Sequence, residues 1–110
     1  IMGGWNQSQA HAQFVSDVVD HRMNIQAALE APRFTKKNFP GRDVELESRF
    51  SAPVQAELTA RGHQLKVGGF YDDSVGGGQA VLRDFAAGVN YGASDPRKDG
   101  AAIPQLMGGK

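Results

Sequence analysis

Two adjacent glycines, Gly3 and Gly4, stand just before a stretch with helical periodicity and are the residues of this sequence best suited to do chemistry. Glycine has no Cβ, so it can adopt positive φ and lets the backbone approach a ligand closely. The amide hydrogens of such a pair can point into one site and hold a developing oxyanion. The pair could equally be a flexible turn that leads into the helix. Trp5 follows directly and would either line such a site or pack against another part of the protein.

Other residues that could carry chemistry favour structural roles. His11, His21 and His63 do not form an HExxH or similar ligand pattern, so we expect no metal site. The run Gly76-Gly77-Gly78 lacks the downstream Lys-Ser/Thr of a phosphate-binding loop, and its position before a strand favours close backbone packing. The sequence has no cysteine, which excludes disulfides and thiolate ligands. No cofactor is therefore expected.

Several charged residues are placed where internal ion pairs would form. We expect Arg33, after Pro32, to pair with an acid such as Glu30 or Asp95 rather than to bind a carboxylate ligand. Asp95-Pro96-Arg97 is typical of a turn in which the aspartate accepts hydrogen bonds from nearby amides and the arginine pairs internally. Asp72-Asp73 lies in a polar loop and is expected to be solvated.

Three helices are predicted around these residues. Apolar residues recur at helical spacing from Gln9 to Met23, and a short helix from Ile25 to Ala31 follows an Asn24 N-cap and stops at Pro32. A third helix follows Ser51 and ends at Gly62, which favours the left-handed conformation of a helix stop.

Four strands are predicted, and Thr35–Asp43 is predicted to be a loop. Val44–Phe50 alternates, which places Glu45, Glu47 and Arg49 on a solvent face. Further strands are predicted over His63–Phe70, Gly76–Asp84 and Val89–Ala93, with a hairpin turn at residues 85–88. The order of helices and strands indicates the α+β class.

Composition limits the possible partners. The 110 residues make one domain at most, and 12 basic and 12 acidic side chains cancel. No basic stripe indicates nucleic-acid binding, and no apolar run is long enough to span a membrane. No signal peptide is visible in the sequence.

Six segments in order resemble the γ-glutamyltranspeptidase family of N-terminal-nucleophile hydrolases, and they cover nearly the whole chain. Gly3, Gly4, Gln7 and Gln9 match a Pro-Gly-Gly…Gln-Pro-Gln motif, in which Met2 and Ser8 replace the prolines. The other five segments begin with the helix end at residues 24–34 and the strand at Val44–Phe50. They continue with Ala60-Arg61-Gly62-His63, Gly77-Gly78-Gln79-Ala80-Val81 and residues 94–102, which start Ser-Asp-Pro-Arg.

The resemblance implies that residues 1–110 are the C-terminal portion of the small, catalytic subunit, within a four-layer αββα sandwich. It implies a γ-glutamyltransferase or hydrolase acting on glutathione-like amides, with an N-terminal Thr nucleophile outside this chain and Gly3 and Gly4 as oxyanion donors. The partners would be the large subunit, the rest of the small subunit and the γ-glutamyl substrate. The location would be periplasmic or secreted. The isolated chain, which begins with Ile1, is expected to be inactive and to self-associate. Alternatives are a cephalosporin acylase, a poly-γ-glutamate-processing relative or a non-catalytic interaction module.

Overall fold

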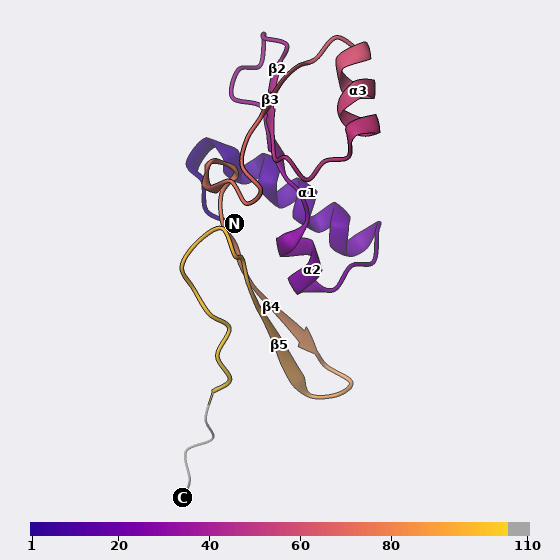
Figure 1. Cartoon of the computed structure of the whole chain (residues 1–110). Helices are drawn as coiled ribbons and strands as arrows, with labels where there is room; N and C mark the ends of the chain where they lie inside the picture. Colours follow the sequence, from indigo (N-terminus) through magenta and orange to yellow (C-terminus); the bar gives the residue numbers. More distant parts are fainter. Residues whose placement is uncertain (106–110) are drawn as a thin grey trace, which may run out of the picture.

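The computed structural model describes residues 1–105, and its first half is mainly helical (Figure 1). A 3-10 helix, η1 (Gly4–Asn6), runs directly into α1 (Gln7–Val19). The helix ends four residues before the predicted Met23, because Arg22 takes a left-handed φ of 55° and reverses the chain. The amide of Met23 then donates to the carbonyl of Asp17 at 3.0 Å, which closes this turn.

The short helix α2 (Ile25–Glu30) forms as predicted. The side chain of Asn24 accepts a hydrogen bond from the amide of Ala27 at 2.9 Å, which satisfies one of the free donors at the helix start. Ile25, Ala28 and Leu29 are buried, so the helix turns one apolar face inward. Pro32 follows the helix and excludes its continuation.

A three-stranded sheet follows, in the order β1-β2-β3. It consists of β1 (Phe34–Thr35), β2 (Asp43–Leu46) and β3 (Gln64–Val67), and α3 (Ala52–Ala60) connects the last two. β1 lies antiparallel to β2, whereas β2 and β3 are parallel, so β2, α3 and β3 form one crossover unit. The strand β1 lies where a loop was predicted from Thr35 onward, because its two residues are too short to give a pattern.

The strand predicted over Val44–Phe50 is wrong at its end. β2 stops at Leu46, and Glu47 begins a turn in which its carbonyl accepts the amide of Phe50 at 3.3 Å. The predicted solvent exposure of Glu47 is also wrong, since its side chain is fully buried. β3 likewise stops at Val67, three residues before the predicted end of the His63–Phe70 strand.

The second half of the chain ends in an antiparallel hairpin of β4 (Gln79–Asp84) and β5 (Val89–Ser94). The predicted turn between them is confirmed, with Gly88 at a φ of 71°. The strand predicted from Gly76 begins three residues later, at Gln79, because residues 76–78 make other contacts. A 3-10 helix, η2 (Asp73–Val75), precedes those three glycines.

The hydrophobic core is small and lies where α1 and α2 meet the base of the hairpin. Ile25, Leu29 and Ala93 form its buried centre, and Phe14 and Val18 of α1 pack against them. The rest of the hairpin projects away from the helices, at the opposite end from α3 (Figure 1). The mixture of helices and antiparallel and parallel strands confirms the α+β class. Across residues 1–105, none of the helices is long and apolar enough to cross a bilayer.

Candidate functional site

The two candidate glycines form the turn that starts η1. Gly3 has a φ of 145° and Gly4 a φ of 54°, and both values lie where side chains are rarely tolerated. The carbonyl of Gly3 accepts the amide of Asn6 at 3.0 Å, which closes the turn. The sequence therefore requires glycine here for conformational reasons, whatever else the pair does.

The amide N–H groups of both glycines are available as donors. The amide of Met2 donates to the carbonyl of Gly77 at 2.9 Å, and the next backbone donor in an assigned hydrogen bond is that of Asn6. Between them, the amides of Gly3 and Gly4 find no acceptor in the part of the chain that the structure describes. Free donors of this kind are expected in the first turn of a helix, where they attract negative charge.

These glycines border an open hollow of about 740 Å³. Trp5 lies at its edge with a fully exposed side chain, which fits the predicted place beside the candidate site, and its packing against another part of the protein stays a prediction. The remaining lining residues come from η1, α1, β1 with the segment that follows it, and η2: Asn6, Ser8, Gln9, Thr35, Lys36, Lys37, Phe39 and Ser74. The hollow thus brings together four segments around the free amides.

The three glycines at 76–78 pack against the residues that form the Gly3–Gly4 turn. The predicted close packing of this run is confirmed. A Cβ on Gly76, which has a φ of 82°, would lie 2.2 Å from the carbonyl oxygen of Met2. A Cβ on Gly78 would lie 2.7 Å from Leu29. Only glycine therefore lets this segment lie between α2 and the entrance to the Gly3–Gly4 turn.

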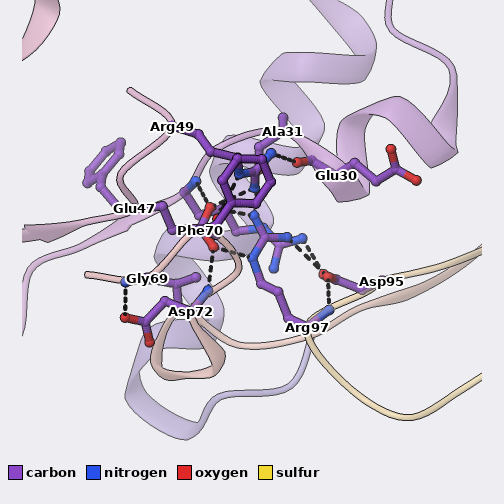
Figure 2. Close-up of polar contacts among 12 residues, drawn as sticks. Glu30, Ala31, Glu47, Arg49, Gly69, Phe70, Asp72, Asp95 and Arg97 are labelled. Atoms are coloured by element: carbon purple, nitrogen blue, oxygen red, sulfur yellow. Dashed lines mark hydrogen bonds and ion pairs between the residues drawn. The ribbon is translucent and has the colours of Figure 1, made fainter. Parts of the chain in front are cut away.

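A buried charge cluster lies next to these glycines. It consists of two carboxylates and three arginines that come from segments far apart in the sequence, of which Arg49 alone is partly exposed: Arg33, Glu47, Arg49, Asp95 and Arg97. Figure 2 shows Glu47 between Arg49, Arg97 and the backbone of Asp72. The Glu47 carboxylate accepts five hydrogen bonds. Two come from the amides of Arg33 and Asp72, one from Arg49, and two from the guanidinium of Arg97 at 2.7 and 2.6 Å.

Arg97 uses all five of its N–H donors. Besides the two bonds to Glu47, it donates to Asp95 at 3.0 Å and to the carbonyls of Leu29 and Ala31 at 2.7 and 2.8 Å. Those carbonyls belong to the C-terminal end of α2, where free acceptors and the negative end of the helix dipole favour a cation. The predicted internal pairing of Arg97 is confirmed.

The Arg33–Asp95 ion pair connects the cluster to the glycines at 76–78. Arg33 donates to the Asp95 carboxylate and, at 3.0 Å, to the carbonyl of Gly76. Asp95 also accepts the amides of Gly78 at 3.1 Å and Arg97 at 3.0 Å, as predicted for the turn at residues 95–97. Of the two acids predicted as partners for Arg33, the structure selects Asp95.

Electrostatics keep both carboxylates of the cluster ionised. Burial alone would raise the pKa of Glu47, but the hydrogen bonds from Arg97 and from the amides of Asp72 and Arg33 outweigh it, and the pKa lies below its ordinary value. Burial opposes ionisation of Asp95 in the same way, and the amide of Arg97 and the side chain of Arg33 lower its pKa overall. Burial lowers the pKa of Arg33, whereas contact with Glu47 and Asp95 overcomes burial and raises that of Arg97.

The histidines and the Asp72-Asp73 pair lie outside the Gly3–Gly4 hollow. His11 and His21 are exposed, and no group of three or more potential metal ligands occurs within residues 1–105. Asp73 is exposed, as predicted, whereas Asp72 is half-buried. Its carboxylate accepts the amides of Ser74 at 2.9 Å and Gly69 at 3.2 Å, and hydrogen bonding lowers its pKa.

Sequence reasoning missed one residue beside the candidate site, Asn6, and one in the charge cluster, Glu47. Asn6 is buried under the Gly3–Gly4 turn and donates to the carbonyl of Val75 at 2.8 Å, while its own carbonyl oxygen finds no partner among the described residues. Glu47 was assigned to solvent because it continues the alternation of β2. The motif in which it stands, Val44–Phe50, was the one signal that could have identified it.

Comparison with known proteins gives a consistent result. The sequence profile of the γ-glutamyltranspeptidase family matches residues 1–105. The glutathione hydrolase-like YwrD proenzyme of Bacillus subtilis is 33% identical over 104 residues, which cover 92% of this chain and 20% of that protein. The oxamate amidohydrolase proenzyme of Klebsiella pneumoniae is 30% identical over 104 residues, again 92% of this chain and 20% of that protein.

A solved structure agrees with the same assignment. The crystal structure of cephalosporin acylase from Bacillus halodurans superposes with a TM-score of 0.88 at 36% identity, covering 96% of this chain and 19% of that one. The chain thus folds as the corresponding part of that enzyme does, and it spans about a fifth of the length of the curated relatives it matches.

Proposed function

Because the chain belongs to the γ-glutamyltranspeptidase family, we propose that it is the C-terminal portion of the small subunit of an N-terminal-nucleophile enzyme that cleaves γ-glutamyl amides. In this proposal the amides of Gly3 and Gly4 stabilise the oxyanion of the reaction. The nucleophile and the groups that bind the ends of the glutamyl moiety lie on the remainder of the enzyme. Members of the family are hydrolases and transferases, and the related proteins include an amidohydrolase and an acylase.

The proposed chemistry is covalent catalysis. The hydroxyl oxygen of an N-terminal Thr attacks the amide carbonyl carbon, and its proton passes to the Thr α-amine. The carbonyl oxygen becomes an anion that accepts hydrogen bonds from the free amides of Gly3 and Gly4. Collapse of this intermediate breaks the C–N bond, and the leaving amine takes the proton from the α-ammonium group. Water or an acceptor amine then attacks the ester carbonyl and releases the glutamyl group.

One observation carries the proposal. Two successive glycines at positive φ present amide donors that no described carbonyl uses, at the edge of a hollow large enough for a substrate. An oxyanion site needs this arrangement, because its donors must be fixed before the charge develops. A simple turn into a helix would also use glycine, but it would not require an adjoining hollow.

The identity of the acyl group that the enzyme removes distinguishes two candidate functions. The similarity to a cephalosporin acylase supports a second candidate, an enzyme of the same fold that removes a different acyl group. Initial rates of the full-length enzyme with a γ-glutamyl anilide, a glutaryl amide and oxamate separate the two candidates. We expect the γ-glutamyl anilide to give the highest kcat/KM, and a preference for either other substrate contradicts the γ-glutamyl assignment.

The oxyanion role is tested by Gly4→Ala in the full-length, processed enzyme. Among the described residues, none beyond its two chain neighbours lies within 4 Å of the position of the new Cβ, so we expect the variant to fold, at the cost of a left-handed alanine. Alanine keeps the amide N–H, but its Cβ would obstruct the hollow or rotate the amide away from the oxyanion. We therefore expect turnover to fall by about a hundredfold or more, the usual effect of losing such a donor. Gly3→Ala should also lower turnover, but its φ of 145° makes larger backbone shifts unavoidable.

Gly88→Ala is the matched control. Gly88 has a φ of 71°, again with no described residue beyond its chain neighbours near the new Cβ, but it lies in the hairpin turn far along the chain from the site. The melting temperature should decrease by a similar amount in both variants, whereas turnover should decrease only in Gly4→Ala. Normal turnover per folded molecule in Gly4→Ala would return the glycine pair to the role of a turn.

A further inference from the structure

We propose that the Arg33–Asp95 ion pair positions the amides of Gly3 and Gly4, acting through the glycines at 76–78. Its catalytic consequence rests on the oxyanion role proposed above, whereas the mechanical connection can be measured by itself. Asp95 and Arg33 are positioning residues in this proposal, since neither lines the hollow beside Gly3 and Gly4.

The first link joins the ion pair to the glycine run. Asp95 accepts the amide of Gly78 at 3.1 Å, and Arg33 donates to the carbonyl of Gly76 at 3.0 Å. The two side chains bind each other and are both buried. The pair therefore holds the run at both ends with hydrogen bonds in which one partner is charged, and such bonds are stronger than neutral ones.

The second link joins the glycine run to the candidate amides. The amide of Met2 donates to the carbonyl of Gly77 at 2.9 Å, in an isolated antiparallel bridge. The position of a Cβ on Gly3 lies 3.5 Å from the Cα of Gly76, and that of a Cβ on Gly76 lies 2.2 Å from the carbonyl oxygen of Met2. The two segments are thus in contact without room for movement toward each other.

A parallel connection strengthens this link. The side chain of Asn6, at the end of η1, donates to the carbonyl of Val75, the residue just before the glycine run. The Gly3–Gly4 turn is therefore attached to residues 75–77 on both of its sides. Within this segment the carbonyl of Gly76 accepts a hydrogen bond from Arg33, and Asp95 accepts the amide of the next residue, Gly78.

The rest of the cluster explains why this anchor is stiff. Arg97 bonds to Asp95 and Glu47 and to the end of α2, so Asp95 cannot rotate without breaking several buried hydrogen bonds. An oxyanion site loses activity when its donors move by about 0.5 Å or more from their productive place. A rigid charged anchor supplies that precision where the hydrophobic core is small.

The test is Asp95→Asn in the full-length, processed enzyme. The amide side chain keeps the size of Asp95 but loses its charge and one acceptor. We expect kcat for γ-glutamyl anilide to fall about tenfold or more with KM within about twofold, because substrate binding groups are not displaced. Backbone hydrogen exchange measured by mass spectrometry should become at least about fivefold faster in the peptides spanning residues 2–7 and 75–78.

Asp84→Asn is the matched control. Asp84 also accepts a backbone amide, that of Ala87 at 2.9 Å, but it lies at the hairpin turn. It should leave kcat and exchange at residues 2–7 unchanged. A second perturbation, Gly76→Ala, pushes directly against Met2. Combined with Asp95→Asn it should lower kcat by less than the product of the two single effects, because both act through one segment.

The two proposals fail in different ways. Normal kcat in Gly4→Ala together with faster exchange at residues 2–7 in Asp95→Asn would remove the oxyanion role and keep the mechanical connection. Reduced kcat in Gly4→Ala, with Asp95→Asn behaving like Asp84→Asn, would overturn the positioning proposal. If Asp95→Asn does not yield processed enzyme, Arg33→Lys replaces it. Loss of soluble protein in both variants would assign the pair to folding alone and would also overturn the proposal.

Discussion

The buried charge cluster places five ionic side chains where the hydrophobic effect alone would place apolar ones. Each ion has to lose water on burial, and this loss is offset only when every hydrogen-bonding atom is used. Glu47 meets that condition with five donors, and Arg97 meets it with five acceptors. Removing one member leaves its partners charged, buried and unpaired, which costs about 3–5 kcal/mol in comparable sites.

The cluster makes stability depend on pH in acid. The pKa values of Glu47 and Asp95 lie below their ordinary values of 4.5 and 3.8 in the folded protein. A carboxyl group of this kind stabilises the fold above its unfolded pKa, and the contribution disappears as the pH falls through the lower, folded pKa. We therefore expect the melting temperature of the full-length enzyme to fall steeply below about pH 4.5. Thermal unfolding followed by circular dichroism between pH 7 and pH 3 measures this.

Glu47→Gln identifies the source of that dependence. The variant should already be less stable at pH 7, and its melting temperature should fall less steeply in acid. Glu57→Gln is the control, because Glu57 forms an exposed pair with Arg61 at the C-terminal end of α3 and its substitution should change neither quantity measurably. An unchanged acid dependence in Glu47→Gln would show that other groups govern it.

The sequence predicted an ion pair of the cluster only where its two residues lie close together along the chain. The role of Arg97 followed from a turn motif in which donor and acceptor are two residues apart. Arg33 and Asp95 lie 62 residues apart, and sequence reasoning could give only a choice between Glu30 and Asp95. Glu47 was misplaced because alternation reports which way a side chain points while the strand continues, and β2 had already ended at Leu46.

At the scale of elements, the helix α2 depends on hydrogen bonds from the charge cluster, because the helix has little stability of its own. A helix of six residues is too short to form by itself in water. Its start is capped by Asn24, and its last carbonyls accept hydrogen bonds from three arginines of the cluster: Leu29 from Arg33 and Arg97, Glu30 from Arg49, and Ala31 from Arg97. Side chains therefore satisfy free backbone groups at both ends of the helix, and burial of its apolar face adds further stability.

The N-cap gives a prediction at this scale. Asn24→Ala removes the acceptor for the amide of Ala27, and loss of such a cap costs about 1 kcal/mol. We expect this decrease in the free energy of unfolding in urea titrations of the full-length enzyme. Asn90→Ala is the control, because Asn90 accepts a bond from Arg83 in an exposed position on the hairpin. Equal effects of the two substitutions would argue against an N-cap role.

Helices and strands with strong local signals were predicted well, and their ends were not. The cap and the proline defined α2 closely, and the hairpin turn was placed correctly. The end of α1 depends on one left-handed residue, Arg22. Arginine does not favour that conformation, so the sequence does not predict it. The strand β1 exists only because β2 lies beside it, and this pairing is a tertiary contact that no local pattern contains.

At the scale of the whole molecule, much apolar surface has no cover among the described residues. Five large apolar side chains of the hairpin and its turn are exposed: Val81, Leu82, Phe85, Val89 and Tyr91. The radius of gyration is 16.4 Å, whereas a compact chain of this length would have about 13 Å. Because the relatives are about five times longer, the absent cover is consistent with the rest of a family enzyme.

The isolated 110-residue chain should therefore self-associate or be only marginally stable. Exposed apolar surface on this scale is normally an interface, and association would make the melting temperature rise with protein concentration. Sedimentation velocity and thermal unfolding at 5, 50 and 500 µM measure both properties. Val81→Ser, on the 76% exposed side chain of β4, should weaken association, whereas Ala80→Ser on the inward face should lower stability instead. A monomer at the highest concentration, with a sharp transition that does not depend on concentration, would mean that this surface needs no partner.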